Sequence, residues 1–203
     1  MAYSDFTLEQ VIETFDLKEK RTDLFSQTPC LTPSSWLQQT LDLSLEFALA
    51  SGSEKARSEF IVAPVLLAME QMMGKSFAIH SGKKLDVDST KGLNGECDFI
   101  LSKGRMSNTI QAPIFSMVEA KKQDLDLGYG QCIAQMLGAK LYNQRKANEV
   151  DRIWGCVTTG ESWQFLTLQD TTVMFDEIVY YISQLGKILG ILNQIIHPYS
   201  PNP

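Results

Sequence analysis

Apolar residues recur at helical spacing along the first 73 residues of the chain. Residues 8–15 place Leu, Val, Ile and Phe three and four positions apart, which predicts a short amphipathic helix or arm. Thr32 and Pro33 are typical of an N-cap followed by proline at the first helical position, which predicts that a second helix begins there. A third helix is expected over residues 54–73, with a kink at Pro64 because proline removes a backbone donor. The apolar stripe of the second helix consists of Trp36, Leu37, Leu41, Leu45, Ala48 and Leu49.

From residue 77 onward the apolar positions change to the period of β-strands. Residues 77–80 and 85–87 predict two strands around a turn at 81–84. Residues 95–102 alternate, with Cys, Phe and Leu on one face and Glu, Asp and Ile on the other. Residues 114–121 form a dense apolar strand that becomes ionic only at its end.

The last third of the chain predicts a helix, a hairpin and a terminal helix. A helix is expected over residues 130–146, and residues 153–159 and 162–168 flank a Gly-Glu pair typical of a two-residue β-hairpin turn. Apolar residues step by three and four over 173–196, which predicts a long C-terminal helix. The order of elements predicts a mixed α/β fold, with helices packed on a central sheet.

The predicted C-terminal helix carries more apolar surface than one core needs. Four apolar residues lie outside its main stripe, namely Tyr181, Ile188, Ile191 and Ile195. The surplus indicates a second contact, which is either a homodimer or a helix held between the sheet and the N-terminal helices. We expect a single domain overall, with an N-terminal helical arm (1–53), a core (54–170) and a C-terminal helix that packs on the core or on a partner (171–203).

Composition and chain pattern exclude several classes. The chain has 203 residues, of which 44% are hydrophobic and 21% charged, as in an ordinary globular domain. No apolar run reaches the roughly 18 residues of a membrane span, and the N-terminus lacks a basic-then-apolar signal, so we expect a cytoplasmic protein with no membrane partner. The four cysteines form no CxxC pair and are expected to be free thiols. His80 and His197 lack metal-ligand spacing.

Charge is distributed unevenly along the chain. The net charge of −6 at pH 7 counts against nucleic acid as a partner, but residues 75–152 hold 12 Lys and Arg against 9 Asp and Glu. These cations could line a nucleic-acid groove, although each alone is also an ordinary solvated residue. The candidates are Lys83, Lys84, Lys91, Lys103, Arg105 and Lys122.

Asp98 and Glu119 are carboxylates in otherwise apolar predicted strands. A desolvated carboxylate costs several kcal/mol unless it is paired or binds a cation. If adjacent strands bring the two together, a divalent metal would compensate their charge, and oxygen ligands suit magnesium or manganese. Lys121 follows Glu119 by two positions, which in a strand places both side chains on one face. Such a cluster could hydrolyse a phosphodiester.

The same residues also fit ordinary structural roles without a metal ion. Lys121 could form an ordinary ion pair with Glu119 or Asp98 at a strand end. Glu59 is a third carboxylate, on the preceding kinked helix, and equally fits a solvated helix face. Gln131 opens the helix after the second strand and equally fits an ordinary first-turn residue.

The order of these residues resembles the PD-(D/E)XK nuclease superfamily. Glu59 on a helix, Asp98 on a strand, Glu-Ala-Lys at 119–121 on the next strand and Gln131 on a helix are similar to its motif, over roughly residues 54–170. The chain looks most like the nuclease domain of type I restriction enzyme R subunits and stand-alone relatives. The resemblance implies a restriction-endonuclease-like fold with extra N-terminal helices and a long C-terminal helix.

The resemblance also implies roles for the matching positions. Asp98 and Glu119 would bind Mg²⁺, or Mn²⁺ as a substitute, with the Ala120 carbonyl as a further ligand. Glu59 would support the metal directly or through water, Lys121 would position the attacking water, and Gln131 would orient the lysine or the phosphate. Two positions depart from the pattern: Cys97 replaces the motif's proline, and Gln135 stands where relatives often have tyrosine.

The sequence supports three hypotheses about the function of the protein. The first is a magnesium-dependent nuclease that hydrolyses DNA in preference to RNA, alone or beside a restriction-modification partner. The second is a non-catalytic member of the same fold that binds a protein or a nucleic acid. The third is a structural α/β protein that dimerises through its C-terminal helix.

Overall fold

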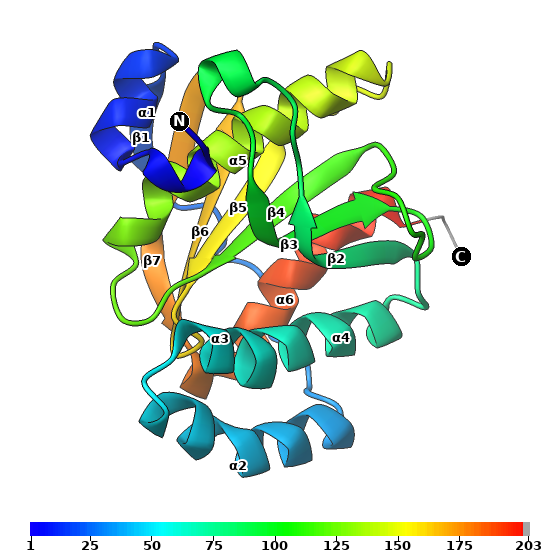
Figure 1. Cartoon of the computed structure of the whole chain (residues 1–203). Coiled ribbons are helices and arrows are strands. Elements are labelled where there is room, and N and C mark those ends of the chain that lie inside the picture. Colours follow the sequence, from blue (N-terminus) through cyan, green and yellow to red (C-terminus); the bar gives the residue numbers. More distant parts are fainter. Residues whose placement is uncertain (201–203) are drawn as a thin grey trace.

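A seven-stranded mixed sheet with helices on both faces forms the centre of the protein, as the computed structural model of residues 1–200 shows (Figure 1), and the predicted α/β class is confirmed. The strand order is β1-β7-β6-β5-β4-β3-β2. The strands are β1 (Lys18–Thr22), β2 (Phe77–Lys84), β3 (Glu96–Lys103), β4 (Ile114–Ala120), β5 (Ile153–Thr158), β6 (Ser162–Gln169) and β7 (Thr172–Tyr181). The helices are α1 (Leu8–Thr14), α2 (Ser35–Ala50), α3 (Glu54–Arg57), α4 (Ala63–Met72), α5 (Asp126–Arg145) and α6 (Leu185–Ile196).

Two strand pairs of this sheet are parallel. Strand β4 pairs with β5, and the connection between them is α5, which returns the chain across one face of the sheet. Strand β1 pairs with β7 in parallel at one edge, and the remaining neighbours are antiparallel. Strand β2 forms the other edge.

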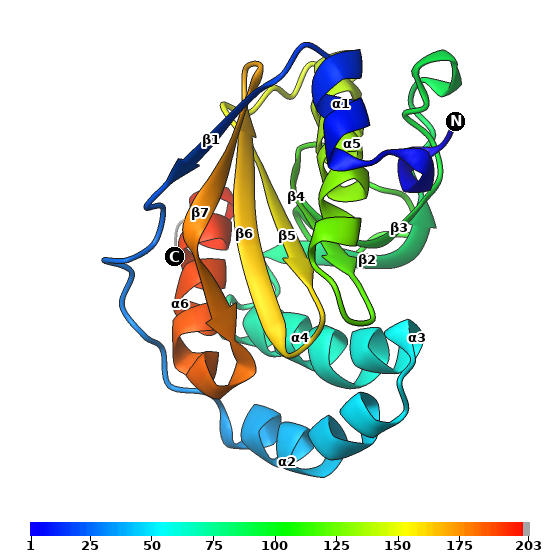
Figure 2. The same cartoon turned by 90° about the vertical axis from the view of Figure 1, so that its left-hand side faces the viewer.

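Each face of the sheet has its own apolar core. Helices α1 and α5 cover one face together with the hairpin-like segment 85–95 (Figure 2). Helices α4 and α6 cover the other face, and α2 lies outside α4 (Figure 1). At the end of β4, Val118 belongs to the core beneath α4 and α6, whereas Met117 belongs to the core beneath α5. Glu119 follows Met117 by two positions and therefore points toward α5.

The helical segment after residue 53 is disturbed where Pro64 predicts it. Ser58–Val62 form a π-helical turn between α3 and α4. Because Pro64 has no N–H to donate, the Phe60 carbonyl accepts a hydrogen bond from Ser44 Oγ at 2.7 Å instead. The wider turn thus follows from the proline and from α2 packed beside it.

The expectation of one long helix over residues 173–196 is wrong. Thr172–Tyr181 form strand β7, and only Leu185–Ile196 are helical. Residues 173–181 are rich in β-branched and aromatic side chains, which favour strands. A tight turn with Asp170 at φ 51° also sets them antiparallel to β6. The C-terminal part of the chain is therefore a strand followed by a shorter helix.

Two further expectations about strands also need correction. The expected turn at residues 81–84 is absent, because β2 continues through it and pairs with β3 as far as Lys84. Gly82 adopts φ 60° within that strand. Strand β1, Lys-Glu-Lys-Arg-Thr, carries no apolar alternation and was not predicted. It pairs with β7 through the backbone, and the Arg21 guanidinium lies over the Phe175 ring.

Three of the four surplus apolar residues are buried within the chain. Ile188, Ile191 and Ile195 are at most 1% exposed, whereas Tyr181 is the last residue of β7 and is 52% exposed. On its remaining side α6 contacts residues 28–31, where a Cβ on Gly190 would come within 2.0 Å of the Pro29 carbonyl oxygen. These contacts agree with a helix held inside one chain, and the three buried isoleucines are not available to a homodimer.

No helix within residues 1–200 combines the length and apolar composition needed to cross a membrane. The four cysteines are free, with Cys30 exposed and the other three buried.

Candidate active site

Glu119 and Lys121 meet at the carboxyl end of β4. Glu119 is 1% exposed, and its Oε1 accepts a hydrogen bond from Lys121 Nζ at 2.7 Å. The predicted placement of both side chains on one face is therefore confirmed. Lys121 Nζ also donates to Gln131 Oε1 at 3.1 Å. An ammonium has three N–H groups, so one donor of Lys121 remains for a further acceptor.

Helix α5 supplies two glutamines to this cluster. Gln131 and Gln135 lie one helical turn apart, so both face β4. Gln135 is fully buried and its Nε2 donates to Glu119 Oε2 at 2.8 Å, while its own Oε1 has no partner. Gly128 allows this close approach of α5, because a Cβ there would lie 3.1 Å from Lys121 Cγ.

Asp98 comes to the same place from β3. Phe99 pairs with Val118, so Asp98 lies beside the last residues of β4. Its Oδ2 accepts a hydrogen bond from the Ala120 backbone N–H at 2.7 Å. The structure thus brings together four of the predicted site residues, Asp98, Glu119, Lys121 and Gln131, and the Ala120 N–H binds Asp98 to the end of β4.

Burial disfavours the charged form of both carboxylates. For Glu119, burial and then the charge of Asp98 raise the pKa to about 8, although Lys121 opposes the shift. For Asp98, burial raises the pKa, with smaller contributions from Glu54 and Glu96, and the hydrogen bond from Ala120 opposes it. For Lys121, burial acts against the charged form, but the ion pair with Glu119 outweighs it and the pKa is raised. The cluster therefore keeps a charged lysine beside carboxylates that resist ionisation.

A cavity of about 330 Å³ opens next to Asp98 on the side of α3. Glu59 lines it, as does Glu54, and Ser81 and Gly82 of β2 lie across from them. Glu59 is exposed and its carboxylate lies 3.8 Å from Lys55 Nζ. Glu59 therefore shares a cavity with Asp98, but it does not join the hydrogen-bonded cluster around Glu119.

A divalent cation fits part of this donor set. Across residues 1–200, no three His, Cys, Asp or Glu side chains gather closely enough to hold an ion. Magnesium, however, is usually bound by one or two carboxylates and keeps several waters. Asp98 and Glu119 supply two such carboxylates, and burial raises the pKa of both even though Lys121 opposes the shift. Two desolvated carboxylates from neighbouring strands thus fit a hard cation.

Two neighbours of the site were not anticipated. Gln135 was noted only as a departure from the family pattern, although its spacing of four from Gln131 could have placed it on the same helix face. Glu54 was also not predicted, since it looks like an ordinary first-turn acid of α3. By contrast, the predicted β5–β6 hairpin is confirmed, and its polar side chains stabilise the turn: Thr158 Oγ1 donates to the Ser162 carbonyl at 2.9 Å, and Trp163 Nε1 donates to the Gly160 carbonyl at 3.0 Å.

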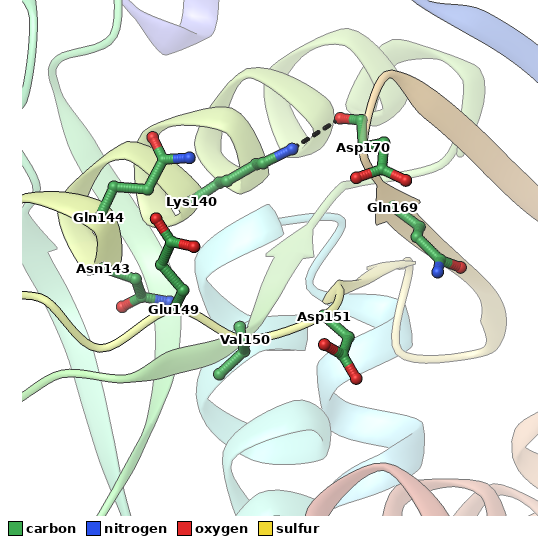
Figure 3. A pocket seen from close by; sticks show the side chains of 8 residues that line it. All are labelled: Lys140, Asn143, Gln144, Glu149, Val150, Asp151, Gln169 and Asp170. Carbon is green, nitrogen blue, oxygen red and sulfur yellow. Dashed lines mark hydrogen bonds between the residues drawn. The ribbon is translucent and has the colours of Figure 1, made fainter.

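A second, more enclosed polar cavity of about 450 Å³ lies at the opposite end of the sheet (Figure 3). It is bordered by the end of α5, the start of β5 and the β6–β7 turn, where Lys140 Nζ donates to the Asp170 carbonyl at 2.8 Å. Asn143 on its wall is committed to the backbone of Ile114. None of the candidate site residues lines this cavity, so it lies apart from the site.

Comparison with known proteins gives a limited picture. No protein-family model matches the chain. The chain is 26% identical over 182 residues to Crinkler effector protein 1 of Rhizophagus irregularis. That similarity covers 81% of this chain, but the chain spans only 37% of the length of the curated relative.

Proposed function

We propose that the protein is a divalent-metal-dependent nuclease that hydrolyses phosphodiester bonds, with DNA favoured as substrate. One observation carries the proposal. The Lys121 ammonium is fixed by Glu119 and Gln131 with one N–H unused, and the half-buried Asp98 lies on the neighbouring strand, where it accepts from the Ala120 N–H. A positioned cation beside carboxylates is a combination that can hydrolyse a phosphodiester.

In the proposed mechanism, Lys121 acts through its third N–H. Because Glu119 and Gln131 restrain two of its donors, the third has a defined direction and can orient a water or stabilise charge that develops on a phosphate oxygen. The raised pKa of Lys121 keeps it charged at neutral pH, so it serves as an electrostatic group and a hydrogen-bond donor.

Asp98 and Glu119 would hold the metal ion, and the Ala120 carbonyl is the proposed further ligand. When bound, Mg²⁺ or Mn²⁺ would polarise the phosphate and lower the pKa of a bound water. Gln135 holds Glu119 through Oε2, so the carboxylate keeps its orientation. Glu59 supports the site from the neighbouring cavity through water, given its exposed position.

A second candidate is a non-catalytic binding module with the same fold. Both carboxylate oxygens of Glu119 already accept hydrogen bonds, and no third ligand side chain joins the cluster within residues 1–200. A protein that retains only the scaffold would show such an internally satisfied cluster. The coverage of only 37% of the curated relative also fits a module of a larger protein.

Cleavage of plasmid and linear DNA in Mg²⁺ or Mn²⁺ tests the proposal. We expect Asp98→Asn and Lys121→Ala to abolish cleavage, since each removes one charged member of the cluster. Glu149→Gln, purified in parallel, is the control, because that residue lines the cavity at the far end of the sheet. Equal activity in all four proteins would identify a contaminating nuclease and refute the claim.

Calorimetric titration with Mg²⁺ and Mn²⁺ separates the two candidates. The nuclease proposal expects binding of the ion that is lost in Glu119→Gln. Absence of binding in the wild-type protein, together with absence of cleavage, favours the binding module.

A further inference from the structure

A cavity of about 600 Å³ lies at the β2 edge of the sheet and is separate from the candidate site. Its walls come from the end of β2 and the residues that follow it, the loop between β3 and β4, and the C-terminal end of α5. Arg145 at the end of α5 donates to the Val87 carbonyl, which ties the segment after β2 to the helix. The cavity is therefore built by three separate parts of the chain.

The charged groups of this cavity are mostly cations. Lys83, Lys84 and Lys146 line it, against the single carboxylate of Asp86. Asp86 is already engaged, because its Oδ1 accepts a hydrogen bond from the Gly95 N–H at 3.0 Å. Within residues 1–200 none of the three ammonium groups forms a salt bridge or a hydrogen bond. Lys146 Nζ lies 5.8 Å from the centroid of the Tyr142 ring, and Lys84 pairs in register with Glu96. Three cations without a salt bridge in one cavity attract an anion with several charges.

Uncharged donors complete the lining. Asn108, Thr109 and Gln111 on the β3–β4 loop line the same cavity. Gln111 Nε2 donates to Thr109 Oγ1 at 2.7 Å, so the Thr109 hydroxyl and the Asn108 amide are the donors left for a ligand. Tyr142 anchors that loop, since its hydroxyl donates to the Ile110 carbonyl at 2.7 Å. Hydroxyl, amide and ammonium donors are the groups that contact phosphate oxygens in protein–DNA complexes.

Strand β2 connects this cavity to the candidate site. Ser81 and Gly82 line the cavity beside Asp98, whereas the next two residues, Lys83 and Lys84, line the basic one. Two residues of a strand span about 7 Å, which equals the rise of about two nucleotides in a duplex strand. A nucleic-acid strand whose reacting phosphate lies at Asp98 would thus reach Lys83 and Lys84 within a few nucleotides.

We infer that the basic cavity binds the phosphodiester backbone of the nucleic acid on which the candidate site acts, a few nucleotides from the reacting bond. This inference rests on the proposed function. Lys83, Lys84 and Lys146 contact backbone phosphates and position the strand, and they take no part in the bond-breaking step. The cavity thereby gives an acidic protein a local site for a polyanion.

Binding of a fluorescein-labelled 20-base-pair DNA duplex, followed by fluorescence anisotropy in EDTA, tests the inference without requiring cleavage. The test variant is Lys83→Gln/Lys84→Gln/Lys146→Gln. The control is Lys18→Gln/Lys20→Gln/Lys75→Gln, which removes equal charge from β1 and from the opposite end of β2. Circular dichroism and thermal unfolding verify that both variants are folded.

We expect the test variant to bind at least about tenfold more weakly at 50 mM salt, because three phosphate contacts are lost. The slope of log affinity against log salt should also fall by about 2 to 3, at roughly 0.9 per contact. The control variant should retain the wild-type slope. Equal slopes in wild type and test variant, or an equal loss in both variants, would overturn the inference.

Competition distinguishes a strand from a small anion. Inorganic phosphate at the same total phosphate concentration as the duplex should not displace it, because single contacts are weak. Displacement would overturn the inference in favour of a small-anion site. If the wild type fails to cleave DNA yet binds it through these lysines, the nuclease proposal fails while the backbone site stands.

Discussion

Glu119 should make the stability of the protein depend on pH in a way that Glu119→Gln removes. The folded protein releases the Glu119 proton only near pH 8, because burial and Asp98 raise its pKa, whereas an unfolded glutamate releases it near 4.5. Between these values the folded state binds the extra proton, so the free energy of unfolding falls as pH rises from 4.5 to 8. Below 4.5 both states are protonated, and above 8 both are ionised, so the effect is confined to this window.

The size of this effect follows from the two pKa values. Each pH unit of difference is worth about 1.4 kcal/mol, so a rise from 4.5 to about 8 lowers stability by at most about 5 kcal/mol across the window. Glutamine has nearly the same shape and no proton to release. The difference in unfolding free energy between wild type and Glu119→Gln should therefore fall by several kcal/mol over this range.

Urea unfolding at half-unit pH steps from 4.5 to 8.5, in EDTA, measures the difference. Asp98 is present in both proteins, so the comparison isolates Glu119 and its coupling to Asp98. A difference that stays constant within about 1 kcal/mol over pH 5–8 would show that Glu119 ionises equally in both states and refute the reasoning. Added Mg²⁺ should flatten the wild-type curve, because a bound cation favours the ionised carboxylates, and leave Glu119→Gln unchanged.

Three other substitutions give independent outcomes. Lys121→Met removes the cation that opposes the shift of Glu119, so the pH-dependent loss of stability in urea unfolding should extend to higher pH than in wild type. Asn143→Leu should lower the unfolding free energy by roughly 1–3 kcal/mol, because its amide binds both the N–H and the carbonyl of Ile114, and an unchanged urea midpoint would contradict this. Gly190→Ala should cost roughly 1–3 kcal/mol, since its Cβ would lie 2.0 Å from a backbone oxygen, and an unchanged melting temperature would contradict this close contact.

The core of the candidate site was predictable because its signals are local. Polar residues at the ends of apolar strands identified Asp98 and Glu119, and the spacing of two placed Lys121 on the side of Glu119, as the 2.7 Å contact confirms. Gln135 binds Glu119 from α5, which packs on β4. Its role depends on how α5 lies over β4, which no local pattern specifies.

The elements that were predicted wrongly depend on contacts between distant segments. Residues 173–181 satisfy a helical spacing as well as a strand pattern, and pairing with β6 decides between them. Strand β1 has no apolar alternation and exists because the edge of β7 offers free backbone groups. Pro64 and the β5–β6 hairpin were predicted because proline and tight-turn chemistry act within a few residues.

Contacts between the N-terminal and C-terminal segments constrain the order in which the protein can fold during synthesis. Strand β1 needs β7, and Lys187 Nζ donates to the carbonyls of Phe25, Ser26 and Thr28, up to 162 residues away. At about 5–20 residues per second, the first thirty residues wait roughly 8–30 s for these partners. A ribosome-bound chain stalled before residue 172 would therefore present its N-terminal segment undocked and accessible to a protease, and the segment would become protected only after the rest of the chain is synthesised.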